Sequence, residues 1–167
     1  AGEVIETAAD VENVKPGDRV LMGVRPGGFA EQAVVDADIL LPTPEPFDDV
    51  TAAAFRVTYI TAYHCLLQRG GLKAGEWVLI NGATGGVGLA AVEIAKIHGA
   101  KIIATGGDDG KLEVVRKYGA DHVINYQNGP FRDQVKKITG GNGVNLVYDP
   151  VGGDVFDQSL RCMAWHG

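Results

Sequence analysis

Short apolar runs and helical segments alternate along most of the chain. The clearest run is residues 77–80, Trp-Val-Leu-Ile, which is unbroken and too short for a helix. Such runs are typical of strands buried on both faces of a parallel sheet. We expect further strands at residues 101–104, 122–124 and 144–148, with helices after residue 80 and at residues 111–118 and 131–138. Elements in this order require right-handed crossovers and predict an α/β fold with a doubly wound parallel sheet.

The first 46 residues show a different pattern, in which short strands are separated by turns. A turn is expected at residues 15–18, Lys-Pro-Gly-Asp, among strands at residues 3–7, 19–24 and 29–35. Pro42, Pro44 and Pro46 then stiffen the chain and disfavour helix before Phe47. We therefore place a domain boundary there, with a β domain over residues 1–46 and the α/β domain over residues 47–167. A helix over residues 50–67, capped by Asp48 or Asp49, opens the second domain.

Charge and cysteine content narrow the class of protein. With Lys+Arg 15 and Asp+Glu 21, the net charge of -6 argues against a broad basic face, so nucleic acid is not expected as a partner. Cys65 and Cys162 lie far apart, which favours neither a disulfide framework nor a zinc knuckle and fits a reducing, cytoplasmic compartment. No apolar stretch approaches the roughly 18 residues that a bilayer span needs, so no membrane partner is expected.

The central motif is residues 81–88, Asn-Gly-Ala-Thr-Gly-Gly-Val-Gly, which follows the buried strand and opens an alanine-rich helix. Ala83, Gly85 and Gly88 form a variant of the dinucleotide fingerprint with alanine in first place. A small residue permits the sharp turn, Gly85 lets the backbone approach a pyrophosphate, and Gly88 lets the helix pack closely on the strand. The free N–H groups of the helix then face the anion. The motif predicts dinucleotide binding, with a purely structural turn as the alternative.

The end of the second strand bears on which dinucleotide is bound. NAD enzymes place an acidic residue there to hold the ribose hydroxyls, whereas this chain has Gly106 and Gly107. The missing carboxylate removes the repulsion of a 2'-phosphate, and Lys111 is available as its cation. Asp108 and Asp109 count against this interpretation, and Lys111 has the alternative of a solvated residue in the first turn of a helix. NADP is therefore favoured over NAD, which stays open.

The glycine motif and several other segments resemble the zinc-free quinone oxidoreductases, or zeta-crystallin-like proteins, of the medium-chain dehydrogenase/reductase superfamily. The further matching segments are residues 14–20, 28–31, 52–54, 61–63, 119–126 and 147–153, which span nearly the whole chain. The resemblance implies part of a GroES-like β domain followed by an NADP(H)-binding Rossmann domain, with the substrate between them. It also implies a chain cut short at both ends, a Rossmann domain that is incomplete at its C-terminus, and a homodimer when full length.

From the turn and the resemblance together, the expected cofactor-binding residues are Thr61, Ala83, Thr84, Gly85, Gly86, Val87, Gly88, Gly106, Lys111, Tyr126 and Val151. The resemblance assigns Lys111 and Tyr126 to the 2'-phosphate and Val151 to the wall near the nicotinamide. Thr61, Tyr126 and Val151 have purely structural alternatives, as a helix surface residue, a cover for a strand end and a packing residue. No metal ligands are expected, because the cysteine ligand and the four-cysteine lobe of the zinc-dependent branch are missing.

The function that the resemblance implies is transfer of a hydride from NADPH to a quinone or to the β-carbon of an α,β-unsaturated carbonyl compound. The cofactor supplies the chemistry and the protein orients it, so no catalytic side chain is assigned. Two alternatives stay open. One is a 2-enoyl-thioester reductase on the same framework, and the other is a non-catalytic NADP-binding module or an inactive fragment.

Overall fold

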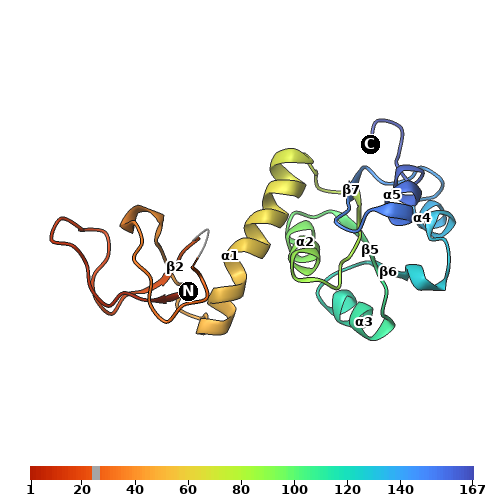
Figure 1. Ribbon diagram of the computed structural model, residues 1–167. Helices are drawn as coiled ribbons and strands as arrows, with labels where there is room; N and C mark the ends of the chain where they lie inside the picture. Colours follow the sequence, from red (N-terminus) through yellow and green to blue (C-terminus); the bar gives the residue numbers. More distant parts are fainter. Residues whose placement is uncertain (24–26) are drawn as a thin grey trace. The chain divides into compact units, whose positions relative to one another are not determined.

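The computed structural model describes residues 1–23 and 27–167, which form two compact units (Figure 1). The first unit is Ala1–Val57 and the second is Thr58–Gly167. Within the described part of the chain, no helix is both long enough and apolar enough to cross a membrane.

The first unit contains a small antiparallel sheet with the strand order β1-β2-β3. Its strands are β1 (Gly2–Glu3), β2 (Arg19–Leu21) and β3 (Leu41–Pro42), and a short 3-10 helix, η1 (Ala37–Ile39), precedes β3. Val20 and Leu21 are the buried residues of β2. The turn predicted at residues 15–18 is confirmed, because the Asp18 N–H donates to the Lys15 carbonyl and Gly17 adopts a φ of +90°.

The strand predicted at residues 29–35 is wrong, because residues 27–35 contain no strand. The side chains of Phe29 and Val34 are fully exposed there. A strand is held by the hydrogen bonds of a neighbouring strand, and the described residues offer this segment no such neighbour. The strand predicted at residues 3–7 is shorter than expected, and the one predicted at residues 19–24 ends at Leu21, with Val24 lying outside the described residues.

A long helical segment follows the proline-rich link, as predicted. Helix α1 (Asp49–Tyr63) begins after Asp48, whose carboxylate accepts the Thr51 N–H at 2.7 Å. Hydrogen bonds from the Thr51 side chain and from this N–H lower the pKa of Asp48. A π-helical segment, η2 (His64–Arg69), continues α1, and the Gly70 N–H donates to the carbonyl of Cys65, five residues earlier. Because α1 contributes residues to both units, the domain boundary proposed at Pro46 stays a prediction.

The second unit is built on a parallel four-stranded sheet with the strand order β6-β5-β4-β7. The strands are β4 (Trp77–Ile80), β5 (Lys101–Gly106), β6 (His122–Asn125) and β7 (Leu146–Tyr148). The helices between and after them are α2 (Gly86–Ile97), α3 (Asp109–Lys117), α4 (Arg132–Ile138) and α5 (Gly153–Leu160), with a 3-10 turn, η3 (Tyr126–Asn128), after β6.

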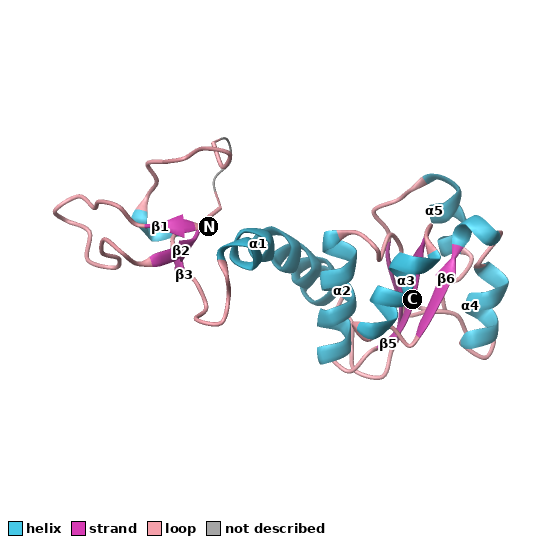
Figure 2. Cartoon of the chain, turned by 90° about the horizontal axis from the view of Figure 1, so that it is seen from below, coloured by secondary structure: helices cyan, strands magenta, loops and turns pink. Residues whose placement is uncertain are grey.

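Helices cover both faces of this sheet, which confirms the predicted α/β class and double winding. Figures 1 and 2 show α2 on one side of the strands and α4 on the other. Val78, Ile80 and Ile102 point into a core shared with α2 and α3, whereas Leu79 and Ile103 point into a second core shared with α4 and α5. Because side chains alternate along a strand, an unbroken apolar run such as β4 supplies both cores.

The order of the strands creates a switch point beside β4. The chain runs outward from β4 to β5 and β6 and then returns to place β7 against the opposite edge of β4. In sheets of this kind, ligands bind outside the carboxyl ends of the strands where the order reverses. The glycine motif follows β4 and is therefore located at this point.

The boundaries of several elements differ from the prediction. Strand β5 continues to Gly106, and β7 begins at Leu146 because Val144 instead forms an isolated bridge with Met163. Helix α5 was not predicted from the sequence. It has few strong helix formers and begins at Gly153, and its half-buried Val155 packs in the core under α4.

A hydrogen bond between α1 and α2 gives a test of the packing in the second unit. The Tyr59 hydroxyl donates to Glu93, and burial together with this bond raises the pKa of Tyr59 to about 12. We expect Tyr59→Phe to lower the free energy of unfolding by about 1–2 kcal/mol at pH 8, because a partly buried carboxylate loses its donor. Urea titration measures this loss.

The pH dependence of unfolding supplies the control for this variant. The folded-state pKa of Tyr59 lies above the value of about 10 for an unfolded chain, so its contribution is present below pH 10 and is lost as the pH rises towards 12. Tyr59→Phe should therefore lose less stability than the wild type between pH 10 and 12. Identical losses in the two proteins would contradict this role of Tyr59.

Candidate dinucleotide-binding site

The turn after β4 is held between two neighbouring strands. The Asn81 N–H donates to the carbonyl of Tyr148 at the end of β7, at 2.9 Å. Two residues later, the Ala83 N–H donates to the carbonyl of Thr105 in β5, also at 2.9 Å. Between them Gly82 has a φ of +59°, a left-handed conformation that favours glycine. The turn therefore has a fixed position at the carboxyl edge of the sheet.

Gly88 and Ala83 allow α2 to pack directly on this turn. A Cβ atom added at Gly88 would overlap the carbonyl oxygen of Gly82 and would lie 2.7 Å from the Cα of Ala83. Ala83 itself is fully buried in the core beneath α2. These two predicted site residues are thus placed in the packed base of the turn, where they bring the helix to the strand, as the fingerprint interpretation expects of them.

Gly85 occupies a different environment. It is the N-cap residue of α2, it is exposed, and its φ of -90° and ψ of 166° are accessible to any residue. A Cβ atom there would meet nothing closer than the Gly82 carbonyl at 3.5 Å, which is an ordinary contact. The fold itself therefore does not require glycine at this position. A ligand that lies close to the backbone would explain why this residue is glycine.

The first turn of α2 presents its amides without a side-chain cap. Glycine at the N-cap position has no side chain to accept the N–H groups of Gly86 and Val87, and the structure shows no side-chain hydrogen bond from Gly85. Gly86 is exposed, and Val87 is half-buried because its side chain packs against the core. An uncapped helix start of this kind suits an anion such as a pyrophosphate.

Thr84 and Gly106 are brought together by the neighbouring strand. A Cβ atom at Gly106 would lie 2.7 Å from the Thr84 Cγ2 and 3.1 Å from the Leu112 Cδ2, so the buried end of β5 has no room for a side chain. An acidic residue that could hold the two ribose hydroxyls would therefore not fit at position 106.

The start of α3 supplies charged groups next to this glycine. Lys111 is exposed in the first turn, and its N–H donates to the Asp108 carboxylate at 2.8 Å. The Asp109 carboxylate accepts the side-chain amide of Asn125, also at 2.8 Å. Both carboxylates that argue against a 2'-phosphate are therefore engaged by donors of the protein, although their charges remain close to Lys111.

Tyr126 lies beside Gly107, at the entrance to η3. A Cβ atom at Gly107 would lie 3.3 Å from the hydroxyl oxygen and from Cε2 of Tyr126. The predicted pair Lys111 and Tyr126 is thus placed around the same glycine segment, at the ends of β5 and β6. Their contact with a 2'-phosphate stays a prediction.

Val151 is brought to the glycine turn from the opposite side. Its Cγ2 would lie 3.2 Å from a Cβ atom at Gly82, and its N–H donates to the Asp149 carboxylate at 2.9 Å. The other oxygen of Asp149 is buried and has no hydrogen-bond partner in the described part of the chain. Gly152 and Gly153 follow with positive φ values of 76° and 57°, which turns the chain into α5. The loop after β7 therefore forms one wall beside the turn.

The predicted contact of Thr61 with the turn is not seen in the described part of the chain. Thr61 is half-buried in α1, whereas Thr58, one helical turn earlier, has its Cγ2 3.3 Å from the position of a Cβ at Gly86. Sequence reasoning missed Thr58. It also gave no role to Asn81, a fully buried side chain beneath the turn, although an amide directly after an apolar strand is a visible signal.

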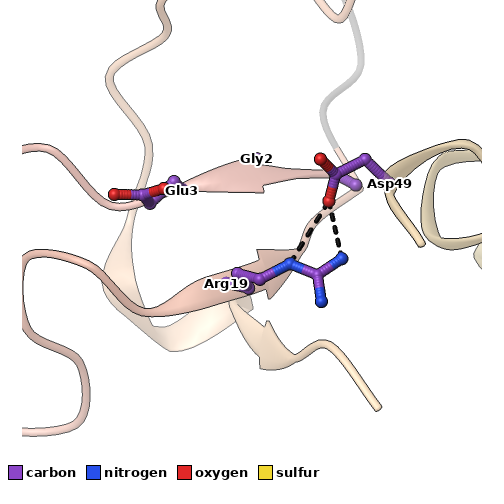
Figure 3. Close-up of a pocket in the computed structure, with 5 residues that line it drawn as sticks. Gly2, Glu3, Arg19 and Asp49 are labelled. Carbon is purple, nitrogen blue, oxygen red and sulfur yellow. Dashed lines mark hydrogen bonds and ion pairs between the residues drawn. The ribbon is translucent and has the colours of Figure 1, made fainter. Parts of the chain in front are cut away.

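A separate surface hollow of about 230 Å³ lies in the first unit and is not the candidate site. It is lined by Ala1, Gly2, Glu3, Arg19 and Asp49. Arg19 and Asp49 pair at 2.6 Å, and Glu3 points away from them (Figure 3). Because the Arg19 guanidinium is already paired with the Asp49 carboxylate, its attraction for a phosphate is reduced.

Metal-binding clusters are absent among residues 1–23 and 27–167, since no three His, Cys, Asp or Glu side chains lie together there in a suitable arrangement. His64 is paired with Gln68 at 2.7 Å, and Cys65, next to it, is half-buried. Burial raises the pKa of the Cys162 thiol to about 11, which keeps it protonated and unsuited to a metal.

Comparison with known proteins agrees with this geometry. A family model described as "Zinc-binding dehydrogenase" matches residues 86–167. Quinone oxidoreductase-like protein 2 of Mus musculus is 42% identical over 168 residues, which are 100% of this chain and 48% of that protein.

Two solved structures share the fold. The quinone oxidoreductase of Escherichia coli complexed with NADPH has a TM-score of 0.83 and 35% sequence identity, covering 97% of this chain and 50% of its own. The CurK enoyl reductase has a TM-score of 0.91 and 30% identity, covering 98% of this chain and 49% of its own. The chain thus spans about half the length of each of these relatives.

The fold, the glycine turn and these similarities define the class: the chain belongs to the medium-chain dehydrogenase/reductase superfamily. Within it, the chain is quinone oxidoreductase-like, as the resemblance predicted.

The two glycines of the turn give a matched pair of variants. We expect Gly85→Ala to change the free energy of unfolding by less than about 1 kcal/mol, because its Cβ makes only ordinary contacts. Gly88→Ala should destabilise by about 1–3 kcal/mol or more, because its Cβ overlaps the Gly82 carbonyl. Dinucleotide affinity, measured by titration of the folded Gly85→Ala protein, should fall at least about tenfold if a pyrophosphate lies against Gly85. Unchanged affinity in Gly85→Ala would contradict the assignment of the turn.

Proposed function

We propose that this protein binds NADP(H) at the turn after β4 and transfers a hydride from it to a quinone or an α,β-unsaturated carbonyl compound. The observation that carries the proposal is the environment of Gly85, a glycine that the fold does not need, located at an uncapped helix start. The choice of cofactor is supported by the similar quinone oxidoreductase of Escherichia coli, whose structure is a complex with NADPH.

The residues present fit a dinucleotide along the carboxyl edge of the sheet. Gly86 and Val87 would hold the pyrophosphate with backbone amides, as helix starts commonly do. The Gly85 N–H donates to the Gly82 carbonyl, so Gly85 would contribute the room for a close approach instead. Gly106 leaves the end of β5 without a carboxylate, and Lys111 would pair with a 2'-phosphate. Val151 would stand beside the nicotinamide ring. The bound cofactor supplies the hydride, and the chain binds it, orients it and excludes water.

No catalytic side chain is proposed. Thr61 is kept as a proposed cofactor contact together with the turn, Tyr126 and Val151. We propose a zinc-independent reaction, because the chain is similar to quinone oxidoreductases and His64 is hydrogen-bonded to Gln68. We also propose a homodimer in a reducing, cytoplasmic setting, which the free thiols of Cys65 and Cys162 fit.

A second candidate is reduction of a 2-enoyl thioester. The similarity to the CurK enoyl reductase extends over 98% of this chain with a TM-score of 0.91, so the same framework suits both reactions. The two functions differ in the acceptor and share the hydride donor. A module that binds NADP(H) without catalysis is the third possibility.

Lys111 tests the preference for NADP over NAD. We expect Lys111→Ala to weaken NADPH binding about tenfold and to leave NADH binding unchanged, because only NADPH carries the 2'-phosphate. Lys117→Ala, an exposed lysine in the last turn of the same helix, is the matched control and should change neither affinity. Equal losses of NADPH and NADH binding in Lys111→Ala would rule out a 2'-phosphate contact.

Substrate profiling separates the candidate functions. NADPH oxidation is followed at 340 nm with quinones, enals and enoyl-CoA thioesters as acceptors, before and after treatment with a chelator. We expect turnover with a quinone or an enal that the chelator leaves unchanged. Preferential turnover of the thioester would select the enoyl reductase, and saturable NADPH binding without any turnover would select the non-catalytic module.

A further inference from the structure

A fully buried hydrogen-bond network lies beneath the glycine turn. The Asn81 side-chain amide donates through Nδ2 to the Ser159 hydroxyl at 2.8 Å and accepts through Oδ1 from the Thr105 hydroxyl at 2.8 Å. Asn81 and Thr105 are 0% exposed, and Ser159 is 1% exposed. Polar groups buried to this degree are costly unless every one is paired, so each bond of the network constrains the others.

The direction of each hydrogen bond in the network is defined. Ser159 donates its own proton to the carbonyl of Val155, one helical turn earlier, at 2.7 Å. Its oxygen must therefore accept from Asn81, which identifies the nitrogen side of the amide. The Thr105 hydroxyl is then the donor to the oxygen side. An aspartate at position 81 would lack the donor that Ser159 needs, and a leucine would lack both groups.

The network joins three segments that the site requires. Asn81 begins the turn, Thr105 immediately precedes Gly106 at the end of β5, and Ser159 lies in α5, the helix that follows the Val151 loop. A backbone hydrogen bond also joins the turn to β5, because the Thr105 carbonyl accepts the Ala83 N–H. One side-chain amide thus touches the elements that carry the pyrophosphate, the ribose and the nicotinamide wall in the proposed function.

We propose that Asn81 is the positioning residue of the dinucleotide site, with Thr105 and Ser159 as its two arms. This inference rests on the proposed NADP(H) binding and deepens it. Asn81 has no exposed atom to offer the cofactor, so it acts by fixing the turn relative to β5 and α5. The Thr105 arm fixes the turn relative to the adenosine side, and the Ser159 arm fixes it relative to the loop that carries Val151.

The two hydrogen bonds of the Asn81 side chain can be removed separately by substitution. Thr105→Val keeps the shape of the side chain and removes the donor to Asn81, and Ser159→Ala removes the acceptor. Binding of NADPH and of 2',5'-ADP, which lacks the nicotinamide half, is measured by calorimetry. We expect Thr105→Val to weaken both ligands by about fivefold to twentyfold. We expect Ser159→Ala to weaken NADPH by a similar factor and 2',5'-ADP by clearly less.

Thr139→Val is the matched control. Thr139 is also a buried threonine of the second unit; its hydroxyl donates to the Val135 carbonyl at 3.0 Å and accepts the Gly143 N–H at 2.9 Å. The control should lose stability in urea titrations to a similar extent as Thr105→Val, and both ligands should keep wild-type affinity. Thr105→Ser, which restores the hydroxyl, should recover most of the affinity.

The outcomes distinguish this inference from the proposed function. A wild-type protein that binds neither ligand refutes the proposed function and the inference with it. A wild-type protein that binds, combined with affinities within twofold of wild type in both Thr105→Val and Ser159→Ala, refutes the positioning role alone. Equal losses of affinity in the Thr139→Val control also refute it. If Thr105→Val lowers stability too far to be assayed, Ser159→Ala tests the same role with a smaller change in volume.

Discussion

The close contact between Gly88 and the carbonyl of Gly82 is the constraint on which the site depends. It is possible only because Gly88 has no Cβ atom, and it lets the first turn of α2 lie directly against the end of β4. From there, the amides of Gly86 and Val87 face the edge of the sheet where the strand order reverses. A bulkier residue would move the helix start away from the strand, and the turn would lose its anion-binding geometry.

The packing beneath this contact explains why the turn is stiff. The backbone of Asn81 is tied to β7, that of Ala83 to β5, and the Asn81 side chain to Thr105 and Ser159. Preorganised amides stabilise an anion more than mobile ones do, because no ordering cost is incurred on binding. The short segment from Asn81 to Gly88 is therefore important both for the packing of the second unit and for the proposed function.

Local patterns were sufficient to predict the four parallel strands of the second unit and the helices between them, although not helix α5. The unbroken run of β4 and the glycines that follow it carry a signal within about a dozen residues, and the strand predicted at residues 77–80 matches β4 at both ends. The segment at residues 29–35 shows the opposite case. Its apolar residues suggested a strand, but a strand depends on a partner elsewhere in the chain, and Phe29 and Val34 are exposed. Helix α5 was missed because its position is fixed by packing rather than by propensity.

The sequence predicted those residues of the candidate site that belong to one short motif or follow a strand directly. The glycines of the turn and the missing acidic residue at Gly106 could be identified from their spacing after a strand. Thr58 and Ser159 could not, because each reaches the turn from a distant part of the chain and neither belongs to a local motif. The same limit applies to the acceptor of the hydride, whose pocket no local pattern describes.

The central claim, that the amides at the start of α2 bind the pyrophosphate of NADP(H), can be tested directly by NMR. In a titration of the isotopically labelled protein with NADPH, the backbone amides of Gly85, Gly86 and Val87 should show saturable shifts that are among the largest in the second unit. A saturable titration in which these three amides do not move, while amides elsewhere do, would contradict the account.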